Sequence, residues 1–412
     1  MFKKVPGTKD ILPNEIGNWQ AIEAIARETF SLYNYREIRT PIIEEAALFK
    51  RTLGNTAEIV QKQMFLIHNQ DDEYVLRPEG TASIARSYLE NSLDKTNAFI
   101  KLYYIGPMFR LERPQKGRLR QFHHIGCEVI GSQEAILDVE LISLAVQLLN
   151  NLAITDYKIK INSLGCLKDK QALSLSLKQS LKNEKQKLCP DCQVRLENNI
   201  LRVLDCKNEG CREVTRTLVL RNSHLCPDCL NHFTEVKSGL EGLNIPFKVE
   251  PYLVRGLDYY NRTVFELTHP NLGSQDAIGA GGRYNNLIKE LGGPDVGGIG
   301  FAFGVERLLL AGKLCKENSS RNLVYLITLG ETAKNAGVKI LHQLRSCGIP
   351  SEMDYLNRSL KAAMRAANDA KAKYVLILGE DELKKNVVSL KDMSNSAQRE
   401  IEIQNLTKEL KC

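Results

Sequence analysis

The sequence lacks any long apolar run. None of its segments approaches the about 18 consecutive apolar residues of a membrane-spanning helix, and no apolar stretch follows the lysines near Met1. These absences argue against a membrane partner and predict a cytoplasmic location. The chain also has no internal repeat and no low-complexity tail, so a repeat architecture is excluded.

Two phosphate-binding motifs are missing as well. The segments 279–284 and 297–307 are rich in glycine, but neither matches GxGxxG or GxxxxGK[ST]. The dinucleotide fingerprint and the P-loop are therefore absent. Glycines in a strand-like run more often let a backbone or a ligand approach closely. We expect a glycine-dense strand here, followed by a helix.

Composition sets further bounds. The 412 residues are 43% hydrophobic and 25% charged, which is ordinary for a globular protein of roughly two to four domains. The net charge of +7 hints at an anionic partner without proving one. Eleven cysteines in a long chain of this kind predict reduced thiols, some of them on a metal, rather than a disulfide framework.

An arginine-rich stretch, 109–128, organises the chain. It starts at the end of an apolar strand, 100–106, runs through a loop with Pro114 and Gly117, and leads into a second strand, 121–130. The pattern predicts a hairpin with a basic tip, suited to a polyanion held against an aromatic face. Taken alone, such a loop is more often a solvated surface.

Near the start of the chain, apolar residues at helical spacing predict an amphipathic helix over 16–33, with Asn14 as its cap. The next segment, 36–43, has an extended pattern, and its Pro41 cannot donate a hydrogen bond to a sheet ladder. We therefore expect this segment at a sheet edge or at the two-fold seam of a homodimer.

The segment 77–81 connects a hairpin, expected from 64–67 and 74–76, to a helix over 82–89. Glu79 and Thr81 are thus placed at a strand-to-helix corner. The simplest interpretation of Thr81 alone is a helix N-cap.

The region 166–242 differs in character and predicts a small inserted helical domain. Six cysteines lie in it after its first residue: Cys189, Cys192, Cys206, Cys211, Cys226 and Cys229. The first two and the last two form CxxC pairs, which is the spacing of a tetrahedral zinc site. We predict that those two pairs, Cys189, Cys192, Cys226 and Cys229, bind zinc. Cys206 and Cys211 leave the choice of ligands open, and cysteines that bind nothing are the alternative.

A sheet pattern resumes at Pro251. In the run 252–266, tyrosines and charged residues interrupt a strand-like sequence, and such buried polar groups are costly unless they serve a site. After a short polar linker, strands and helices alternate over 323–412, which predicts a separate α/β domain.

Together these segments resemble the bacterial histidyl-tRNA synthetases, which are class II aminoacyl-tRNA synthetases, essentially from end to end. The segments that resemble the three class motifs are Arg39-Thr40-Pro41, Phe109-Arg110-Leu111-Glu112 and 300–307. The segments 253–260 and 281–284 resemble the two histidine-specific motifs.

The resemblance implies an α+β catalytic domain with a six-stranded antiparallel class II synthetase sheet, a small helical insertion and a C-terminal α/β anticodon-binding domain. The catalytic domain is expected at 1–165 and 243–317, the insertion at 166–242, and the anticodon-binding domain at 323–412. A homodimer through the first class motif is implied as well.

The implied reaction is that of a histidine–tRNA ligase. Histidine and ATP give histidyl-adenylate and pyrophosphate, and histidine then passes to the 3′ end of its tRNA. Negative charge builds on the phosphate oxygens, where fixed guanidinium groups stabilise it. The resemblance implies that Arg110 and Arg255 have this catalytic role, with Mg²⁺ as an ion associated with ATP.

For ATP, the resemblance implies binding by Arg110, Glu112, Arg118, Phe122 and Arg307. Arg118 would reach the outer phosphates, and Glu112 would accept a hydrogen bond from the adenine amino group. Phe122 and Arg307 would lie on the two faces of the ring.

For histidine, the resemblance implies binding by Glu79, Thr81, His124, Glu128, Arg255, Tyr259 and Tyr260. The imidazole offers one donor and one acceptor, which Glu128 and Tyr260 can match. Glu79 and Thr81 would hold the α-ammonium, because a carboxylate balances its buried charge. His124 departs from the family pattern, in which Gln is usual, and it can replace only one of the hydrogen bonds of Gln.

Two other classes of function remain. A catalytically silent paralogue that acts as a regulatory subunit in histidine biosynthesis resembles the same catalytic core, but Arg110, Arg255, Arg307 and the C-terminal domain all remain here. A module that only binds nucleic acid is permitted by the basic loop and the lysine-rich insertion.

Overall fold

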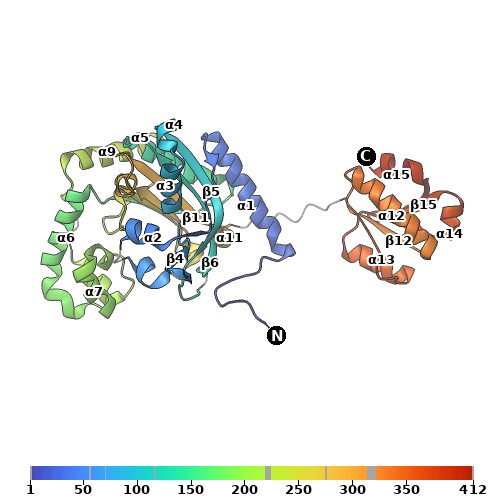
Figure 1. The fold of residues 1–412 in the computed structure, drawn as a ribbon, viewed down its shortest axis with the longest axis horizontal. Coiled ribbons are helices and arrows are strands. Elements are labelled where there is room, and N and C mark those ends of the chain that lie inside the picture. Colours follow the sequence, from blue (N-terminus) through green and yellow to red (C-terminus); the bar gives the residue numbers. More distant parts are fainter. Residues whose placement is uncertain are drawn as a thin grey trace. The chain divides into compact units, whose positions relative to one another are not determined.

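The computed structural model describes residues 2–54, 57–69, 71–115, 117–218, 224–273, 276–312 and 322–410. The chain divides into two compact units, Met1–Cys315 and Lys316–Cys412, which are described separately (Figure 1). Within the described ranges, no helix has the length and apolar character needed to cross a membrane.

The larger unit is built around an eight-stranded sheet with the order β1-β5-β6-β11-β10-β9-β7-β8. Its strands are β1 (Arg36–Glu37), β5 (Ile100–Phe109), β6 (Gln121–Ile130), β7 (Lys158–Ser163), β8 (Lys248–Val249), β9 (Asn261–Thr268), β10 (Ala277–Arg283) and β11 (Gly298–Gly304). The six central strands pair antiparallel, as predicted. The short edge strands β1 and β8 pair parallel with β5 and β7. A sheet edge was one of the two positions expected for the segment that contains β1, whereas β8 was not predicted as a strand.

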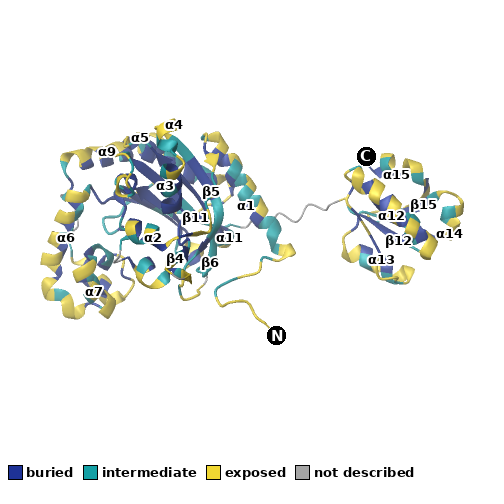
Figure 2. Cartoon of the chain, viewed as in Figure 1, coloured by how far each residue is buried: buried dark blue, intermediate teal, exposed yellow. Residues whose placement is uncertain are grey.

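Apolar helices cover one face of this sheet. They are α1 (Pro13–Leu32), α5 (Ala135–Asn151), α9 (Pro227–Gly242) and α11 (Val305–Ala311), and they share one core with the sheet. In Figure 2 the strands are mostly buried, whereas the outer faces of the helices are exposed. The predicted cap of α1 is wrong: the helix starts at Pro13, with Leu12 as N-cap, and Asn14 lies inside it. Proline suits the first helical turn because its φ angle is already helical.

The segment after α1 joins two sheets, since 36–37 forms β1 and the chain continues into β2 (Ile43–Glu45). A three-stranded sheet with the order β2-β4-β3 contains the predicted hairpin. The elements of this part are β3 (Phe65–Asn69), β4 (Asp72–Leu76), α2 (Ala46–Leu53), the π-helical turn Ile59–Gln63, α3 (Thr81–Glu90) and α4 (Leu93–Thr96).

The insertion is helical, as predicted. It contains α6 (Leu167–Leu181), α7 (Pro190–Asn198), α8 (Glu209–Arg216), α9 and the 3₁₀ turns Lys182–Lys187 and Ile200–Val203. Leu173, Leu177 and Leu181 form a buried stripe on α6 and belong to the same apolar core as α2 and α3. Through this core the insertion packs against the eight-stranded sheet. The remaining short helices of this unit are Pro270–Leu272 and α10 (Leu287–Glu290).

The smaller unit has a five-stranded sheet with the order β13-β12-β14-β15-β16. Its strands are β12 (Val324–Thr328), β13 (Ser351–Met353), β14 (Tyr374–Leu378), β15 (Val387–Asp392) and β16 (Gln398–Glu402). Its helices are α12 (Glu331–Ser346), α13 (Leu360–Asp369), α14 (Glu380–Lys384), the 3₁₀ turn Ile403–Asn405 and α15 (Leu406–Leu410). The first three strands in space are parallel and the last two pair antiparallel. Helices α12 and α13 pack in two separate cores, which gives the α/β arrangement expected from the alternating pattern.

Candidate active site

A cavity of about 660 Å³ lies in the larger unit. A volume in this range suits a ligand of the size of a nucleotide. Every residue predicted to bind ATP or histidine lines it except Glu128: Glu79, Thr81, Arg110, Glu112, Arg118, Phe122, His124, Arg255, Tyr259, Tyr260 and Arg307. The structure therefore brings together side chains that are far apart in the sequence.

Strand β6 separates the core from the cavity because successive side chains point to opposite faces of a sheet. Ile125, Cys127 and Val129 belong to the apolar core beneath α1 and α5. On the alternate positions, Phe122 and His124 line the cavity. Glu128 follows in the same alternation and lies almost completely buried behind the cavity wall.

Glu128 is held by two hydroxyl groups. Thr81 Oγ1 donates to its Oε1 at 2.7 Å and Tyr284 Oη donates to its Oε2 at 2.6 Å. Burial raises the pKa of Glu128 to about 8, although the two hydroxyls act in the opposite direction. A Cβ atom at Gly300 would lie 1.7 Å from Oε2, so only glycine fits beside this carboxyl. The glycine-dense strand therefore leaves room for a side chain beneath the cavity.

Glu79 lies at the predicted corner between β4 and α3. Its carboxylate accepts hydrogen bonds from the backbone N–H groups of Thr81 at 2.7 Å and Ala82 at 2.8 Å. It therefore satisfies the free N–H groups at the start of α3, a position that favours negative charge. The N-cap interpretation of Thr81 is wrong, because Gly80 is the N-cap and the Thr81 side chain points to Glu128. Burial raises the pKa of Glu79.

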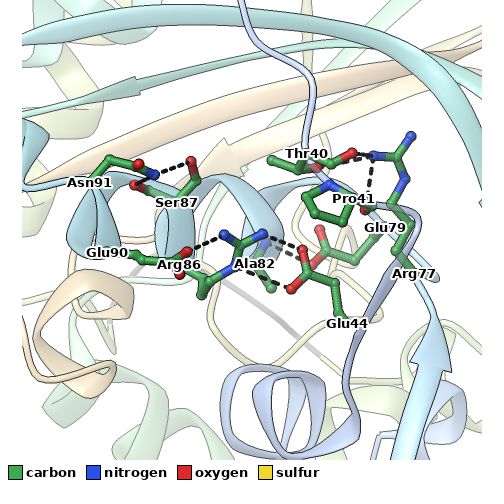
Figure 3. A network of polar contacts seen from close by, with 10 residues as sticks. All are labelled: Thr40, Pro41, Glu44, Arg77, Glu79, Ala82, Arg86, Ser87, Glu90 and Asn91. Atoms are coloured by element: carbon green, nitrogen blue, oxygen red, sulfur yellow. Dashed lines mark hydrogen bonds and ion pairs between the residues drawn. The ribbon is translucent and has the colours of Figure 1, made fainter.

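Arg77 anchors this corner to the segment that follows α1. Figure 3 shows its guanidinium group directed at Thr40, where Nη1 donates to the carbonyl oxygen at 2.9 Å and to Oγ1 at 3.0 Å. Nε donates to the carbonyl of Pro107 on β5 at 3.0 Å. A buried arginine with these three partners joins β5, the corner before Glu79 and the first class motif.

Three arginines lie on the ATP side of the predicted site. Arg110 Nε donates to the carbonyl of Pro78 at 2.9 Å, and its guanidinium carbon lies 5.4 Å from the centre of the Phe122 ring. Arg118 pairs with Glu112 at 3.0 Å, and Arg307 Nε donates to the carbonyl of Gly117 at 3.1 Å. Burial lowers the pKa of Arg110 and of Arg307, but a guanidinium group stays charged in proteins. The cavity wall is therefore cationic.

Arg255 approaches the cavity from the loop before β9. Its Nη1 pairs with Glu266 at 3.0 Å, and its buried Nε has no hydrogen-bond partner among the residues that the structure describes. The loop is fixed by Lys170 of α6, whose Nζ donates to the carbonyls of Asp258 and Tyr260 at 2.9 Å each. The rings of Tyr259 and Tyr260 lie 4.6 Å apart.

His124 is neutral in this setting. Burial and the nearby charges of Arg110, Arg307 and Arg77 lower its pKa to about 3. Its Nδ1 atom is buried and has no hydrogen-bond partner in the described ranges. This side chain therefore presents an uncharged imidazole with one unused polar atom at the cavity wall.

Several residues of the site were missed from the sequence. Tyr284 lies in a recognised motif, yet only the structure shows its bond to Glu128. Lys170 carried no signal of its own in a lysine-rich helix. The insertion also contributes polar residues to the cavity wall: Arg202, Asp205, Lys207 and Arg212. Their position beside the cysteines of the insertion is the one sequence feature that could have indicated them.

The predicted set of metal ligands is corrected by the structure. Cys189 and Cys192 lie close to Cys206 and Cys211, whereas Cys226 and Cys229 lie close to Cys166 and Asp169. The two CxxC pairs thus belong to separate groups, because each pair starts a different helix, α7 and α9.

Comparisons with known proteins agree with the geometry. A family model described as histidyl-tRNA synthetase matches residues 7–308, and one described as anticodon binding domain matches residues 323–412. A histidine–tRNA ligase of Halothermothrix orenii is 46% identical over 416 residues, covering 100% of this chain and 99% of the relative. One of Thermosipho melanesiensis is 45% identical over 98% of this chain and 96% of its own. The crystal structure of apo S. aureus histidyl-tRNA synthetase has a TM-score of 0.82 and 35% identity, with 100% of both chains covered.

The fold and the matching family model are those of an aminoacyl-tRNA synthetase. The chain belongs to the histidyl-tRNA synthetase family.

Proposed function

We propose that the protein is a histidine–tRNA ligase, which activates histidine with ATP to histidyl-adenylate and pyrophosphate and then transfers histidine to the 3′ end of its tRNA. One observation carries this proposal. A single cavity has a cationic wall, from Arg110, Arg118 and Arg307, and a wall with buried carboxyl and phenol groups, from Glu79 and Tyr260. Such a cavity matches a nucleotide on one side and a small zwitterion on the other.

ATP is assigned to the cationic wall. Phe122 and Arg307 enclose the adenine ring, Glu112 accepts from its amino group, and Arg118 contacts the outer phosphates. Mg²⁺ accompanies these phosphates and neutralises part of their charge. The support comes from the stacking distance of Arg110 on Phe122 and from the backbone carbonyl that fixes its guanidinium group.

Arg110 and Arg255 are assigned to the α-phosphate. As the histidine carboxylate attacks the phosphorus and pyrophosphate leaves, negative charge grows on the non-bridging oxygens. Guanidinium groups that are already oriented stabilise this charge without reorganising. Arg255 pairs with Glu266 through one nitrogen and retains Nε for a further acceptor, which supports this role.

Histidine is assigned to the opposite wall. Glu79 and Thr81 receive its α-ammonium, and Glu128, Tyr259 and Tyr260 surround its ring. The pKa of about 8 at Glu128 keeps the unliganded site free of a second buried negative charge near Glu79 at neutral pH. His124 contributes the unused Nδ1 in place of the glutamine amide of relatives, so it makes one hydrogen bond where Gln would make more.

The division of the chain and its assembly also belong to this proposal. We assign the catalytic domain to 1–165 and 243–317, the insertion to 166–242 and the anticodon-binding domain to 323–412. A cytoplasmic homodimer is proposed through the segment after α1. Exposed apolar side chains on and beside the three-stranded sheet support it: Ile42, Ile43, Leu66 and Ile67.

The alternative of a catalytically silent regulatory subunit fits the residues less well. Such a protein needs neither a fixed guanidinium at the α-phosphate nor an anticodon-binding domain. Arg110 and Arg255 are oriented in the cavity, and the anticodon-domain model matches 323–412.

Histidine-dependent ATP–pyrophosphate exchange tests the proposed function. We expect the native protein to catalyse exchange and Arg255→Ala to lower it about 100- to 1,000-fold, as the loss of one oriented transition-state contact does. Histidine affinity, measured by calorimetry, should change far less, because the charge that Arg255 meets grows towards the transition state.

Arg113→Ala is the matched control, because Arg113 is exposed on the same basic loop as Arg118 and does not line the cavity. Its exchange rate should stay near that of the native protein. No exchange by the native protein would reject the ligase assignment, and normal exchange by Arg255→Ala would reject the role of this residue.

A further inference from the structure

The insertion holds two groups of side chains arranged like metal ligands. In each group, one ligand atom per residue lies within 4.8 Å of all the others. We call Cys189, Cys192, Cys206 and Cys211 the four-cysteine group. The second group, the mixed group, consists of Cys166, Asp169, Cys226 and Cys229.

We propose that the four-cysteine group binds one structural Zn²⁺ ion in tetrahedral geometry. Four thiolates without an open position are a common ligand set of structural zinc sites. A Zn–S distance of about 2.3 Å requires sulfur atoms about 3.8 Å apart in a regular tetrahedron. The Sγ atoms of Cys189 and Cys206 are 3.8 Å apart. That spacing fits a shared ion and is far beyond the about 2.05 Å of a disulfide bond.

The surrounding groups suit a cluster of thiolates. The backbone N–H of Cys189 donates to Cys211 Sγ at 3.1 Å, and Arg195 Nη1 lies 3.9 Å from Cys192 Sγ. This N–H group and the guanidinium of Arg195 offset the excess negative charge of four thiolates around a divalent ion. Cys189 is the N-cap of α7, and Asn208 caps α8 by accepting from Cys211 N at 3.4 Å. Two helix starts thus hold three of the four ligands.

The mixed group is already held together by hydrogen bonds. Asp169 Oδ1 accepts from the backbone N–H of Cys226 at 3.1 Å, and Oδ2 accepts from that of Cys166 at 3.2 Å. Its carboxylate therefore connects the first turns of α6 and α9 without an ion. No such carboxylate is present in the four-cysteine group, whose sulfur atoms face one another.

The proposed ion would fix one wall of the cavity. Cys206 and Cys211 enclose a short loop that begins with Lys207, and Arg212 follows at once in α8. Both cationic residues line the cavity that is assigned to ATP. The assignment of this wall to ATP rests on the proposed function, whereas the metal site itself does not.

The zinc content of the purified protein, measured by inductively coupled plasma mass spectrometry, tests the proposal. We expect the full-length double variant Cys206→Ser/Cys211→Ser to contain one zinc per chain less than the native protein. Cys347→Ser, in the smaller unit, is the control for loss of a thiol and should keep the native content. The difference between native protein and double variant decides the result, so ions bound elsewhere do not affect it. An unchanged zinc content in the double variant overturns the proposal.

Measurements on the native protein avoid any failure of the variant to fold. A strong chelator should release zinc and make four more thiols reactive towards a thiol reagent under non-denaturing conditions. Cobalt substituted for zinc should give the intense visible absorption of tetrahedral thiolate coordination. Native protein without zinc, whose thiols react equally with and without chelator, overturns the proposal.

Discussion

The cavity and the four-cysteine group are two polar sites bordered by the same apolar core, and they differ in how their polar atoms are satisfied. At the cavity wall, polar groups from distant segments bond to one another: Thr81 and Tyr284 donate to Glu128, and Arg307 donates to the carbonyl of Gly117. In the four-cysteine group, all side chains come from one short stretch, 189–211, and each sulfur faces other sulfurs.

This difference shows what each site requires. At the cavity, Arg118 and Arg255 have carboxylate partners, whereas Arg255 Nε and His124 Nδ1 are buried without a hydrogen-bond partner among the described residues. In the four-cysteine group, the cationic side chain of Arg195 contacts the thiol of Cys192. Its thiolate form therefore depends on a bound metal ion, which links its stability to metal supply.

The largest effect is expected from a substitution at the cavity wall. Gly300→Ala would place a methyl group 1.7 Å from Glu128 Oε2 and 2.6 Å from the carbonyl of Cys127. Overpacking should cost about 1–3 kcal/mol of unfolding free energy, and displacement of Glu128 should lower pyrophosphate exchange by about 100-fold or more. Denaturant unfolding and exchange kinetics measure both effects.

Gly242→Ala is the matched change in the insertion. Nothing lies within 4 Å of its added Cβ, at the end of α9. Its stability should stay level or rise by up to about 1 kcal/mol. Equal exchange rates in the two variants would contradict the role assigned to Glu128.

A second prediction concerns the dependence of stability on pH. The folded pKa of Glu128, about 8, lies above its ordinary value of 4.5, so the folded protein holds a proton that the unfolded chain releases between those values. The stability from this proton is complete at low pH and is lost as pH rises towards 8, at up to about 1.4 kcal/mol per pH unit. Unfolding free energies of native protein and Glu128→Gln, measured from about pH 5 to 8.5, should differ in slope. Parallel curves would mean that Glu128 is ionised throughout.

The smallest effect separates the two cysteine groups. Asp169→Asn keeps one acceptor oxygen and loses the other, so one of the two bonds from Cys166 and Cys226 disappears. We expect a loss of about 1 kcal/mol of unfolding free energy and an unchanged zinc content. If the variant loses a zinc ion, the mixed group is also a metal site.

The resemblance of the motifs was enough to predict the cavity residues that lie on strands and corners, whereas the residues that the insertion contributes were missed: Arg202, Asp205, Lys207 and Arg212. Tyr284 shows the limit, since its motif was evident but its contact with Glu128 depends on the pairing of β10 with β11 and of β11 with β6. The cysteine partners were not predictable. The spacing in the sequence suggested that the two CxxC pairs bind one ion. In the structure, α6 packs against the start of α9, so Cys226 and Cys229 lie beside Cys166 and Asp169.

Arg77 has a mechanical consequence for the whole site. It lies two residues before Glu79 and is bonded to Thr40 in the segment where a second subunit is proposed to dock. Its guanidinium group also donates to the carbonyl of Pro107 on β5. A shorter side chain in place of Arg77 would therefore release β5, the segment around Thr40 and the corner before Glu79 at the same time, so the position of Glu79 depends on a side chain that does not itself line the cavity.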